Sequence, residues 1–123
     1  MPLLVKLLIC LIAIMHLFFL WFEMFAWERR GPKVFTSISK ELFPQTKVLA
    51  ANQGLYNGFL AAGLIWSLFI SDSTWSIHVA TFFLICIFIA GCYGAYSADK
   101  KIFSVQALPA LIALILLKVL PFI

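Results

Sequence analysis

Charged residues are scarce in this chain, and their scarcity excludes an ordinary soluble domain. Only 11% of the 123 residues are charged, whereas 64% are hydrophobic. A soluble protein of this composition would expose far too much apolar surface to water. The long apolar runs instead indicate an integral membrane protein whose first partner is the lipid bilayer. The net charge of +4 is small and the basic residues lie between the apolar runs, so we expect no nucleic-acid partner.

Cysteine is scarce too, and the motifs of metal sites and nucleophilic sites are missing. The three cysteines, Cys10, Cys86 and Cys92, all lie inside apolar runs. Their odd number argues against a disulfide framework, and no Cys/His spacing typical of zinc accompanies them. The sequence also contains no Ser/His/Asp arrangement and no phosphate-binding loop. We therefore predict no metal site, and the catalytic residues of any activity are unknown.

Four apolar segments alternate with polar connections along the chain. Each is close to the roughly 20 residues that a helix needs to cross ~30 Å of hydrocarbon. The predicted membrane spans are about 2–26, 47–70, 76–97 and 102–121. Two of the three connections are tight, which favours an antiparallel four-helix bundle. The sequence thus predicts an all-α integral membrane protein with a single transmembrane domain over residues 1–123.

Lysine and arginine predict the orientation of this bundle. The first connection, 28–46, is polar, and within it Ser37–Leu42 is expected to form a short interfacial helix. The first and third connections share one side and hold Arg29, Arg30, Lys33, Lys40, Lys47, Lys100 and Lys101. The opposite side has Lys6 and Lys118. By the positive-inside rule we expect 28–46 to be cytoplasmic and both termini to lie outside, in a bacterial inner membrane.

The second apolar segment carries an unusual group of polar side chains. At about 100° per residue they cover an arc of about 140° on a helix. This polar face consists of Asn52, Gln53, Tyr56 and Asn57. Small residues occupy roughly the opposite arc and should accept a neighbouring helix; they are Gly54, Gly58, Ala61 and Ala62. The amides either join helices by hydrogen bonds or line a polar pocket that opens toward the cytoplasm.

Two ionisable residues of the first segment are further candidates. Glu23 lies near its cytoplasmic end, at a depth similar to that of the amides, and His16 shares its helix face two turns earlier. Glu23 is either functional or paired with Arg29, Arg30 or water near the headgroups. For His16 an interior hydrogen bond is favoured over catalysis.

The third segment adds a tyrosine and two glycines near its cytoplasmic end. Tyr93 is a candidate for the polar pocket, with a place in the interfacial aromatic belt as the alternative. We expect Gly91 and Gly94 to pack closely against the second segment. The candidate ligand-binding residues are therefore Glu23, Asn52, Gln53, Tyr56 and Asn57, with His16 and Tyr93 as second candidates.

A family resemblance rests on His16, on Glu23-Met24-Phe25-x-Trp27, and on the long motif from Thr46 to Gly63. These features resemble a family of small bacterial and fungal membrane proteins that is catalogued as domain of unknown function number thirteen hundred and four. The resemblance covers nearly the whole chain, and the motif from Thr46 to Gly63 is very specific. It implies an integral membrane protein of four helices and leaves the activity unassigned.

A more distant resemblance is to the MAPEG superfamily, the membrane-associated proteins of eicosanoid and glutathione metabolism. Ala51-Asn52-Gln53, followed by Asn57, is similar to the start of that superfamily's second-helix motif. The resemblance implies four helices with outside termini and a homotrimer whose ligand sits between neighbouring subunits. It also implies glutathione as the thiol substrate or cofactor.

Three functions are compatible with these residues. The first is a small membrane protein, expected to be a homo-oligomer, whose cytoplasm-facing polar pocket binds a small or lipid-like molecule. The second is a MAPEG-like glutathione-dependent transferase or detoxifying enzyme. The third is a structural subunit, whose amides hold helices together, or a transport subunit that carries a lipid, a quinone or a small metabolite. The sequence therefore leaves open whether the protein is an enzyme.

Overall fold

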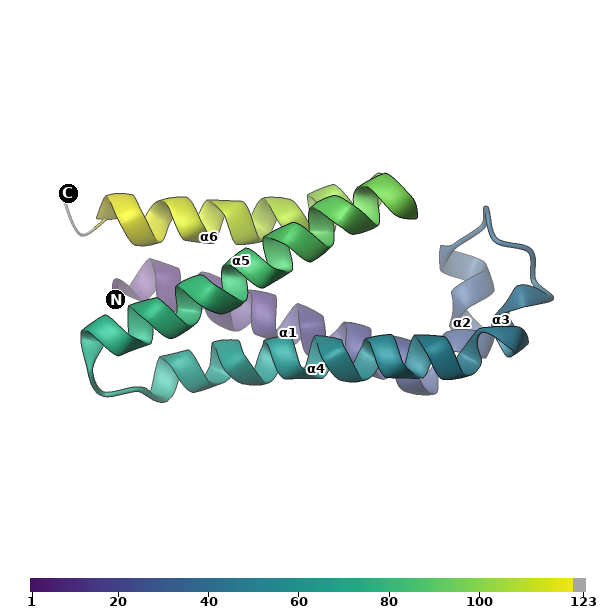
Figure 1. Ribbon diagram of the computed structural model, residues 1–123, viewed down its shortest axis with the longest axis horizontal. Coiled ribbons are helices and arrows are strands. Elements are labelled where there is room, and N and C mark those ends of the chain that lie inside the picture. Colours follow the sequence, from purple (N-terminus) through teal and green to yellow (C-terminus); the bar gives the residue numbers. More distant parts are fainter. Residues whose placement is uncertain (121–123) are drawn as a thin grey trace. The chain divides into compact units, whose positions relative to one another are not determined.

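The computed structural model describes residues 1–120. Within them, all regular secondary structure is helical (Figure 1). The α-helices are α1 (Leu3–Phe25), α2 (Trp27–Val34), α3 (Leu42–Gln45), α4 (Lys47–Phe69), α5 (Ser73–Ser97) and α6 (Leu108–Val119). A π-helical turn, η1 (Phe103–Ala107), leads directly into α6. The prediction of an all-α protein is confirmed for these described residues.

Each predicted span coincides with a helix. α4 begins at Lys47, as predicted, whereas α5 begins at Ser73 rather than at 76. The earlier start follows from a helix cap, because Oδ1 of Asp72 accepts a hydrogen bond from the main-chain N–H of Trp75 at 2.8 Å. The predicted end of the last span, Pro121, lies outside the described residues.

The length and composition of the helices bear on membrane insertion. α1 and α5 are long and apolar enough to cross a membrane. α4 has the 23 residues of α1, but its amides and glycines make it less apolar. The apolar helix formed by η1 and α6, Phe103–Val119, is shorter. Two candidate spans are therefore present in the described chain, and four spans stay a prediction.

The chain divides into two compact units. Unit 1 consists of Met1–Ala13 together with the chain from Leu60 onward, and unit 2 consists of Ile14–Phe59. The long helices α1 and α4 each contribute residues to both units, whereas α5 and α6 belong to unit 1 and α2 and α3 belong to unit 2.

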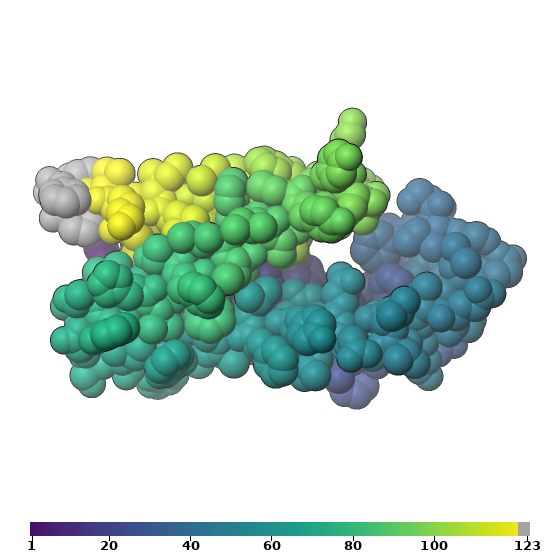
Figure 2. Space-filling model, viewed as in Figure 1, coloured from purple at the N-terminus to yellow at the C-terminus, as the bar shows by residue number. Residues whose placement is uncertain are grey.

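Unit 1 has an apolar core. α5 and α6 lie side by side and run in opposite directions (Figure 1), and atoms of α5 (green) lie directly against those of α6 (yellow) in the space-filling view (Figure 2). Fully buried core side chains include Val5, Ile9, Leu64, Leu84 and Ile87. Spacings of three and four residues place such side chains on one face of each helix, which is how an apolar stripe forms a core.

Two glycines of α5 mark a close approach between helices. A Cβ atom at Gly91 would lie 2.6 Å from the main-chain nitrogen of Ala107, and one at Gly94 would lie 3.0 Å from Cγ2 of Ile102. Both glycines therefore pack against the start of the fourth apolar segment, and the prediction that they pack against the second segment is wrong. The connection after Ser97 is short, so it returns the chain alongside the end of α5.

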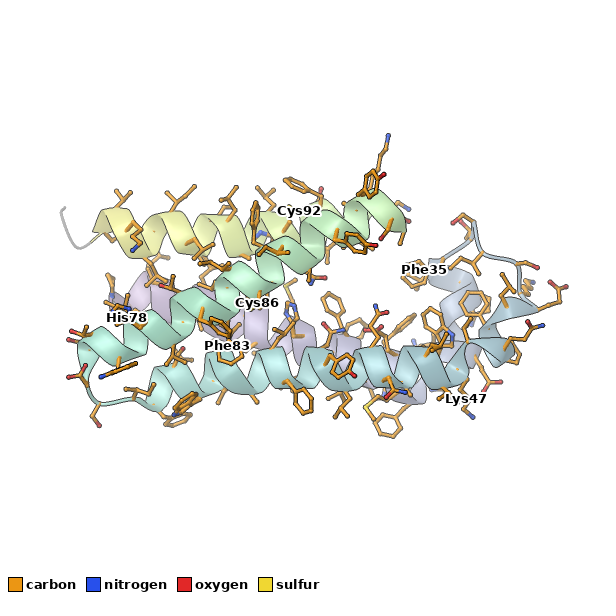
Figure 3. All side chains as sticks on the ribbon, in the orientation of Figure 1. Phe35, Lys47, His78, Phe83, Cys86 and Cys92 are labelled. Carbon is orange, nitrogen blue, oxygen red and sulfur yellow. The ribbon has the colours of Figure 1, made fainter. Side chains whose placement is uncertain are left out.

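The turn from α4 to α5 is held by a hydrogen bond and by a glycine contact. Oγ of Ser76 donates to the main-chain oxygen of Ser67 at 2.8 Å, and both residues are buried. Phe83 points from α5 toward α4 (Figure 3), where Gly63 leaves no room for a side chain beside its ring. These contacts keep the two helices close at the turn.

In unit 2 the second half of α1 packs directly on the first half of α4. A Cβ atom at Gly54 would lie 2.8 Å from Cγ of Met24 and 3.1 Å from the main-chain oxygen of Leu20. A Cβ atom at Gly58 would lie 2.5 Å from Cδ1 of Leu20. The helices come this close because both positions lack a side chain. The prediction that the small residues accept a neighbouring helix is confirmed at these two glycines.

Between α1 and α4, unit 2 contains α2 and α3. Residues 36–41 form turns and bends, so the predicted interfacial helix at Ser37–Leu42 is wrong. Phe43, which is 1% exposed, packs on Gly31 and on the ring of Trp27, with the ring centroids of Trp27 and Phe43 5.1 Å apart. Turn hydrogen bonds shape this segment instead, from the N–H of Ile38 to the oxygen of Phe35 at 3.2 Å and from the N–H of Leu42 to the oxygen of Ser39 at 3.0 Å, and α3 begins at Leu42.

Candidate functional site

A hydrogen bond within unit 2 joins two of the predicted site residues. Glu23 lies near the end of α1, and Asn57 lies in the first half of α4. Nδ2 of Asn57 donates to Oε1 of Glu23 at 2.6 Å, and each residue is 9% exposed. Nδ2 of Asn57 also donates to the main-chain oxygen of Gln53 at 3.3 Å. The two residues, which the sequence places at a similar level of their segments, are thus in direct contact.

The pair meets because both residues lie on buried stripes of their helices. Glu23 follows the buried His16 by seven residues on α1, and Asn57 follows the buried Gly54 by three residues on α4. Such spacings return to the same helix face. Asn57 thus occupies the edge of the polar face that borders the glycines. Because Gly54 has no side chain, the side-chain amide of Asn57 can reach the carboxyl of Glu23.

A carboxyl group with so little exposure needs a partner, since burying it unpaired is costly. Within residues 1–120 the partner of Glu23 is the amide of Asn57, and no ion pair to Arg29 or Arg30 forms. The guanidinium of Arg30 instead lies 5.4 Å from the ring centroid of Trp21. An ionised carboxylate offers about four lone-pair positions, so Asn57 leaves acceptor capacity that a donor on a ligand can use.

The other members of the predicted polar face, Asn52, Gln53 and Tyr56, are exposed. Nδ2 of Asn52 donates to the main-chain oxygen of Val48, within the same helix, at 2.9 Å. Tyr56 is 61% exposed, and its ring centroid lies 6.0 Å from that of Phe59. The structure therefore brings one edge of the polar face into a helix contact and leaves the rest on the surface. Whether these residues bind a ligand stays a prediction.

The two second candidates lie in different units. His16 belongs to unit 2 and is completely buried, with its ring edge-on to Phe19 at a centroid distance of 5.3 Å. Its burial on the same stripe as Glu23 confirms the predicted shared face. Tyr93 belongs to unit 1 and is 69% exposed. Ligand binding by either residue stays a prediction.

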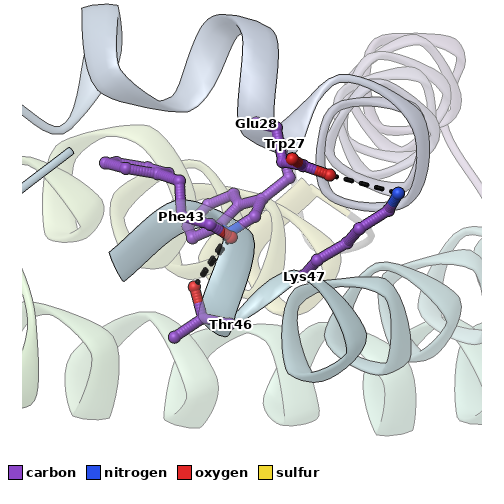
Figure 4. A network of polar contacts seen from close by, with 5 residues as sticks. All are labelled: Trp27, Glu28, Phe43, Thr46 and Lys47. Carbon is purple, nitrogen blue, oxygen red and sulfur yellow. Dashed lines mark hydrogen bonds and ion pairs between the residues drawn. The ribbon is translucent and has the colours of Figure 1, made fainter. Parts of the chain in front are cut away.

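A surface hollow of about 370 Å³ lies where α1 gives way to α2. It is lined by Met24, Phe25, Trp27, Glu28, Arg29 and Lys47, and by none of the predicted site residues. Two contacts join α2 to residues 46 and 47, where α4 begins (Figure 4): Nζ of Lys47 lies 3.1 Å from Oε1 of Glu28, and Nε1 of Trp27 donates to Oγ1 of Thr46 at 3.0 Å.

Sequence reasoning missed this hollow because it took residues 28–46 only as a polar connection between two spans. The signal was present in Glu28 and Arg29, which follow the apolar run at once, and in Lys47, which opens the next helix. The hollow offers hydrogen-bond donors and an apolar wall rather than metal ligands. In the part of the chain that the structure describes, no three His, Cys, Asp or Glu side chains come together to hold a metal ion.

Comparison with known proteins gives a family without an assigned activity. Residues 10–118 match the family described as "Protein of unknown function (DUF1304)". A curated relative, "Uncharacterized protein YpaA" of Lactococcus lactis subsp. lactis (strain IL1403), is 31% identical over 117 residues, which are 94% of this chain and 97% of the relative. No solved structure matches. Neither match bears on the more distant MAPEG resemblance, which stays an expectation. The chain therefore belongs to the family described as protein of unknown function (DUF1304).

Proposed function

We propose that this chain is a multi-pass membrane protein whose four apolar segments all cross the bilayer. Large apolar side chains are exposed on each of them, for example Leu7, Phe59, Phe82 and Ile112. Exposed apolar surface of this extent is typical of contact with lipid. The basic residues of the connections favour a cytoplasmic 28–46 segment and outside termini, and we propose the bacterial inner membrane as its location.

The proposed function is the binding of a small or lipid-like molecule at the buried pair of Glu23 and Asn57. The observation that carries this proposal is their 2.6 Å hydrogen bond within an otherwise apolar helix contact. A polar group without a partner in such surroundings costs about 2–7 kcal/mol, and ionisable residues within membrane segments commonly mark ligand or ion sites. A hydroxyl, amine or amide of the ligand would donate to the remaining acceptor positions of Glu23, while Asn57 holds the carboxyl in place.

The exposed part of the polar face would form the approach to this site from the cytoplasmic side. Asn52, Gln53 and Tyr56 follow one another within two turns of α4, and all are exposed. They can exchange hydrogen bonds with an entering ligand at little cost, because all three side chains are exposed and the amide of Asn52 is bonded only within its own helix. His16, buried on the same face of α1 as Glu23, is proposed as a further residue of the site.

A structural subunit is the second candidate, and the same pair favours it. Nδ2 of Asn57 already donates to a side chain of α1 and to the main chain of α4. Gly54 and Gly58 beside it hold the two helices in close contact. Interhelical hydrogen bonds of this kind contribute about 0.6 kcal/mol on average in membrane proteins. In this interpretation the pair fixes the helix register and binds nothing.

Two leucine substitutions on α4 separate these functions. Thermal unfolding of the full chain in detergent is measured alone and with a bacterial lipid extract, a short-chain quinone or glutathione. The binding function predicts that a lipid or the quinone stabilises the protein and that Asn57→Leu abolishes this effect in a folded protein. The structural function predicts a lower unfolding temperature for Asn57→Leu and no stabilisation by any probe.

Asn52→Leu is the matched control for stability, because the amide that it removes is exposed and bonded within its own helix. We expect its unfolding temperature without ligand to equal that of the unchanged protein. Stabilisation that survives both Asn57→Leu and Glu23→Gln would exclude the pair as the binding site. Stabilisation by glutathione alone would favour the glutathione-dependent enzyme instead.

A homo-oligomer is also proposed, with a trimer expected from the MAPEG resemblance. Support is limited to the exposed apolar surface, which a neighbouring subunit can cover as well as lipid can. The mass of the protein in detergent, measured by light scattering at several protein concentrations, gives the subunit number. A monomer at all concentrations would exclude the trimer.

A further inference from the structure

The hollow at the junction of α1 and α2 combines an apolar wall with basic side chains. Phe25, the last residue of α1, is 71% exposed, and Met24 and Trp27 are half-buried beside it. Arg29 and Lys47 are exposed and line the same space of about 370 Å³. Such a lining fits an amphipathic ligand, with an anionic group at the basic side chains and a hydrocarbon chain along the apolar wall.

The charges in the hollow are unequal. Lys47 is engaged by Glu28 at 3.1 Å (Figure 4), whereas Arg29 has no ion pair among the described residues. The hollow therefore carries a net positive charge, and the guanidinium of Arg29, its strongest hydrogen-bond donor, forms no ion pair there. A guanidinium presents five N–H groups in a planar fork that matches two oxygens of a phosphate. Arginine–phosphate pairs of this type are among the stronger hydrogen-bonded contacts in proteins.

The position of the hollow along the chain points to a lipid as the source of that phosphate. The apolar run of α1 ends at Phe25, and the first charges after it are Glu28 and Arg29. With α1 across the bilayer, this change from apolar to charged residues lies at the level of the headgroups. Trp21 and Trp27 flank it, and tryptophan is enriched at that level. Phosphodiesters of anionic lipids are concentrated there on the cytoplasmic side.

We infer that this hollow binds an anionic phospholipid. The phosphodiester is held by the guanidinium of Arg29, with Lys47 beside it, and one acyl chain lies along Met24 and Phe25. The inference rests on the proposed insertion of α1 into the membrane. It uses neither Glu23 nor Asn57, so it is independent of the ligand proposed for that pair.

The test compares three probes that separate the phosphate from the acyl chains. The full chain in detergent is titrated with dioleoylphosphatidylglycerol, with dioleoylglycerol, which lacks the phosphate, and with soluble glycerol 3-phosphate, which lacks the chains. Binding is quantified by native mass spectrometry. We expect phosphatidylglycerol to bind at least about tenfold more tightly than either of the others, because each lacks one half of the contact.

Arg29→Gln should weaken phosphatidylglycerol binding about tenfold, the effect of losing one charge-assisted hydrogen bond. Arg29→Lys keeps the positive charge but lacks the planar guanidinium, so it should weaken phosphatidylglycerol binding less than Arg29→Gln does. Lys33→Gln is the matched control, because Lys33 is an exposed cation of α2 that does not line the hollow. It should change the affinity less than about twofold. Thermal unfolding without lipid verifies that the variants fold.

Two outcomes would overturn the inference. Equal losses for Arg29→Gln and Lys33→Gln would show general attraction to a basic surface, and glycerol 3-phosphate binding as tightly as the lipid would show a site for free phosphate. Alkaline carbonate extraction of cell membranes tests membrane insertion separately. Release of the protein by carbonate contradicts the proposed membrane protein. A protein that stays in the membrane, but whose phosphatidylglycerol affinity is unchanged by Arg29→Gln, contradicts this inference alone.

Discussion

At the scale of single residues, Gly54 determines whether an amide and a carboxyl can meet between two helices. Its Cα faces the main chain of Leu20 and the side chains of Glu23 and Met24, with no space for a further carbon. The hydrogen bond from Asn57 to Glu23, one turn farther along α4, depends on this approach. A residue without a side chain thus positions the polar pair.

Alanine at position 54 should therefore destabilise the protein more than alanine at position 58. The new Cβ at Gly54 would lie 3.1 Å from the main-chain oxygen of Leu20, which cannot move aside, and overpacking of this kind costs about 1–3 kcal/mol. At Gly58 the new Cβ would meet only the flexible end of the Leu20 side chain, and the better helix propensity of alanine, about 1 kcal/mol, offsets the contact. Unfolding in sodium dodecyl sulfate measures both, and equal losses would contradict this explanation.

The sequence predicts part of the residue-level result. Similar depth in two spans is enough to associate Glu23 with the amides, because depth follows from position along each apolar run. The selection of Asn57 over Asn52 is not predictable from the arc alone, since all four polar residues share it. It depends on which edge of that arc meets α1, and this follows from the packing at Gly54.

At the scale of helices, local sequence preference does not by itself determine where each helix begins or which helix packs on it, and contacts of single side chains contribute to both. The turns at residues 36–41 replace an expected helix, and the buried contacts of Phe43 with Gly31 and Trp27 follow directly after them. The ends of α1 and α4 are predicted to within one residue, since they coincide with changes from apolar to polar residues, whereas the start of α5 at Ser73 depends on the cap at Asp72. The helix that packs on a given glycine is not predictable from the sequence, because a glycine indicates a close neighbour without identifying that neighbour.

Gly31→Ala should loosen the connection between α2 and α3. The added Cβ would overlap the ring of Phe43, so the ring must leave its site or α3 must shift. We expect trypsin to cleave faster after Lys40, in the segment that this contact restrains, as measured by mass spectrometry of a limited digest. Thr36→Ala, an exposed change in the same connection, is the control and should leave the rate unchanged. Identical rates for both variants would exclude a restraining role for Gly31.

At the scale of the whole molecule, composition predicts the class of structure and not its division. The apolar runs are enough to predict α1, α4, α5 and α6, because each run is long and is bounded by charges or turn residues, whereas α2 and α3 fall largely in the polar connection 28–46, where no apolar run indicates them. The separation of residues 14–59 from the remainder is not visible in composition. It reflects which halves of α1 and α4 bury their side chains with α5 and α6, and the sequence does not state these pairings.

Membrane topology gives the whole-molecule prediction. In a chain with Cys10, Cys86 and Cys92 replaced by serine, a new cysteine at Ser71 should react with a membrane-impermeant maleimide in intact cells. A new cysteine at Lys40 should react only in inverted membrane vesicles, because the positive-inside rule places 28–46 in the cytoplasm. Labelling of both positions from the same side would contradict a membrane crossing by α4.

The π-helical turn η1 has a consequence for changes in chain length. A residue inserted into an α-helix turns every later side chain by about 100° about the axis, whereas a π-helical turn absorbs the extra residue locally. Loss of one residue from Phe103–Ala107 would restore an α-helical path and leave Ala110, Ala113 and Leu117 facing the core. The same deletion inside α6 would turn the residues that follow it away from that core. Relatives can therefore differ by one residue in this turn while their last helix keeps its buried face.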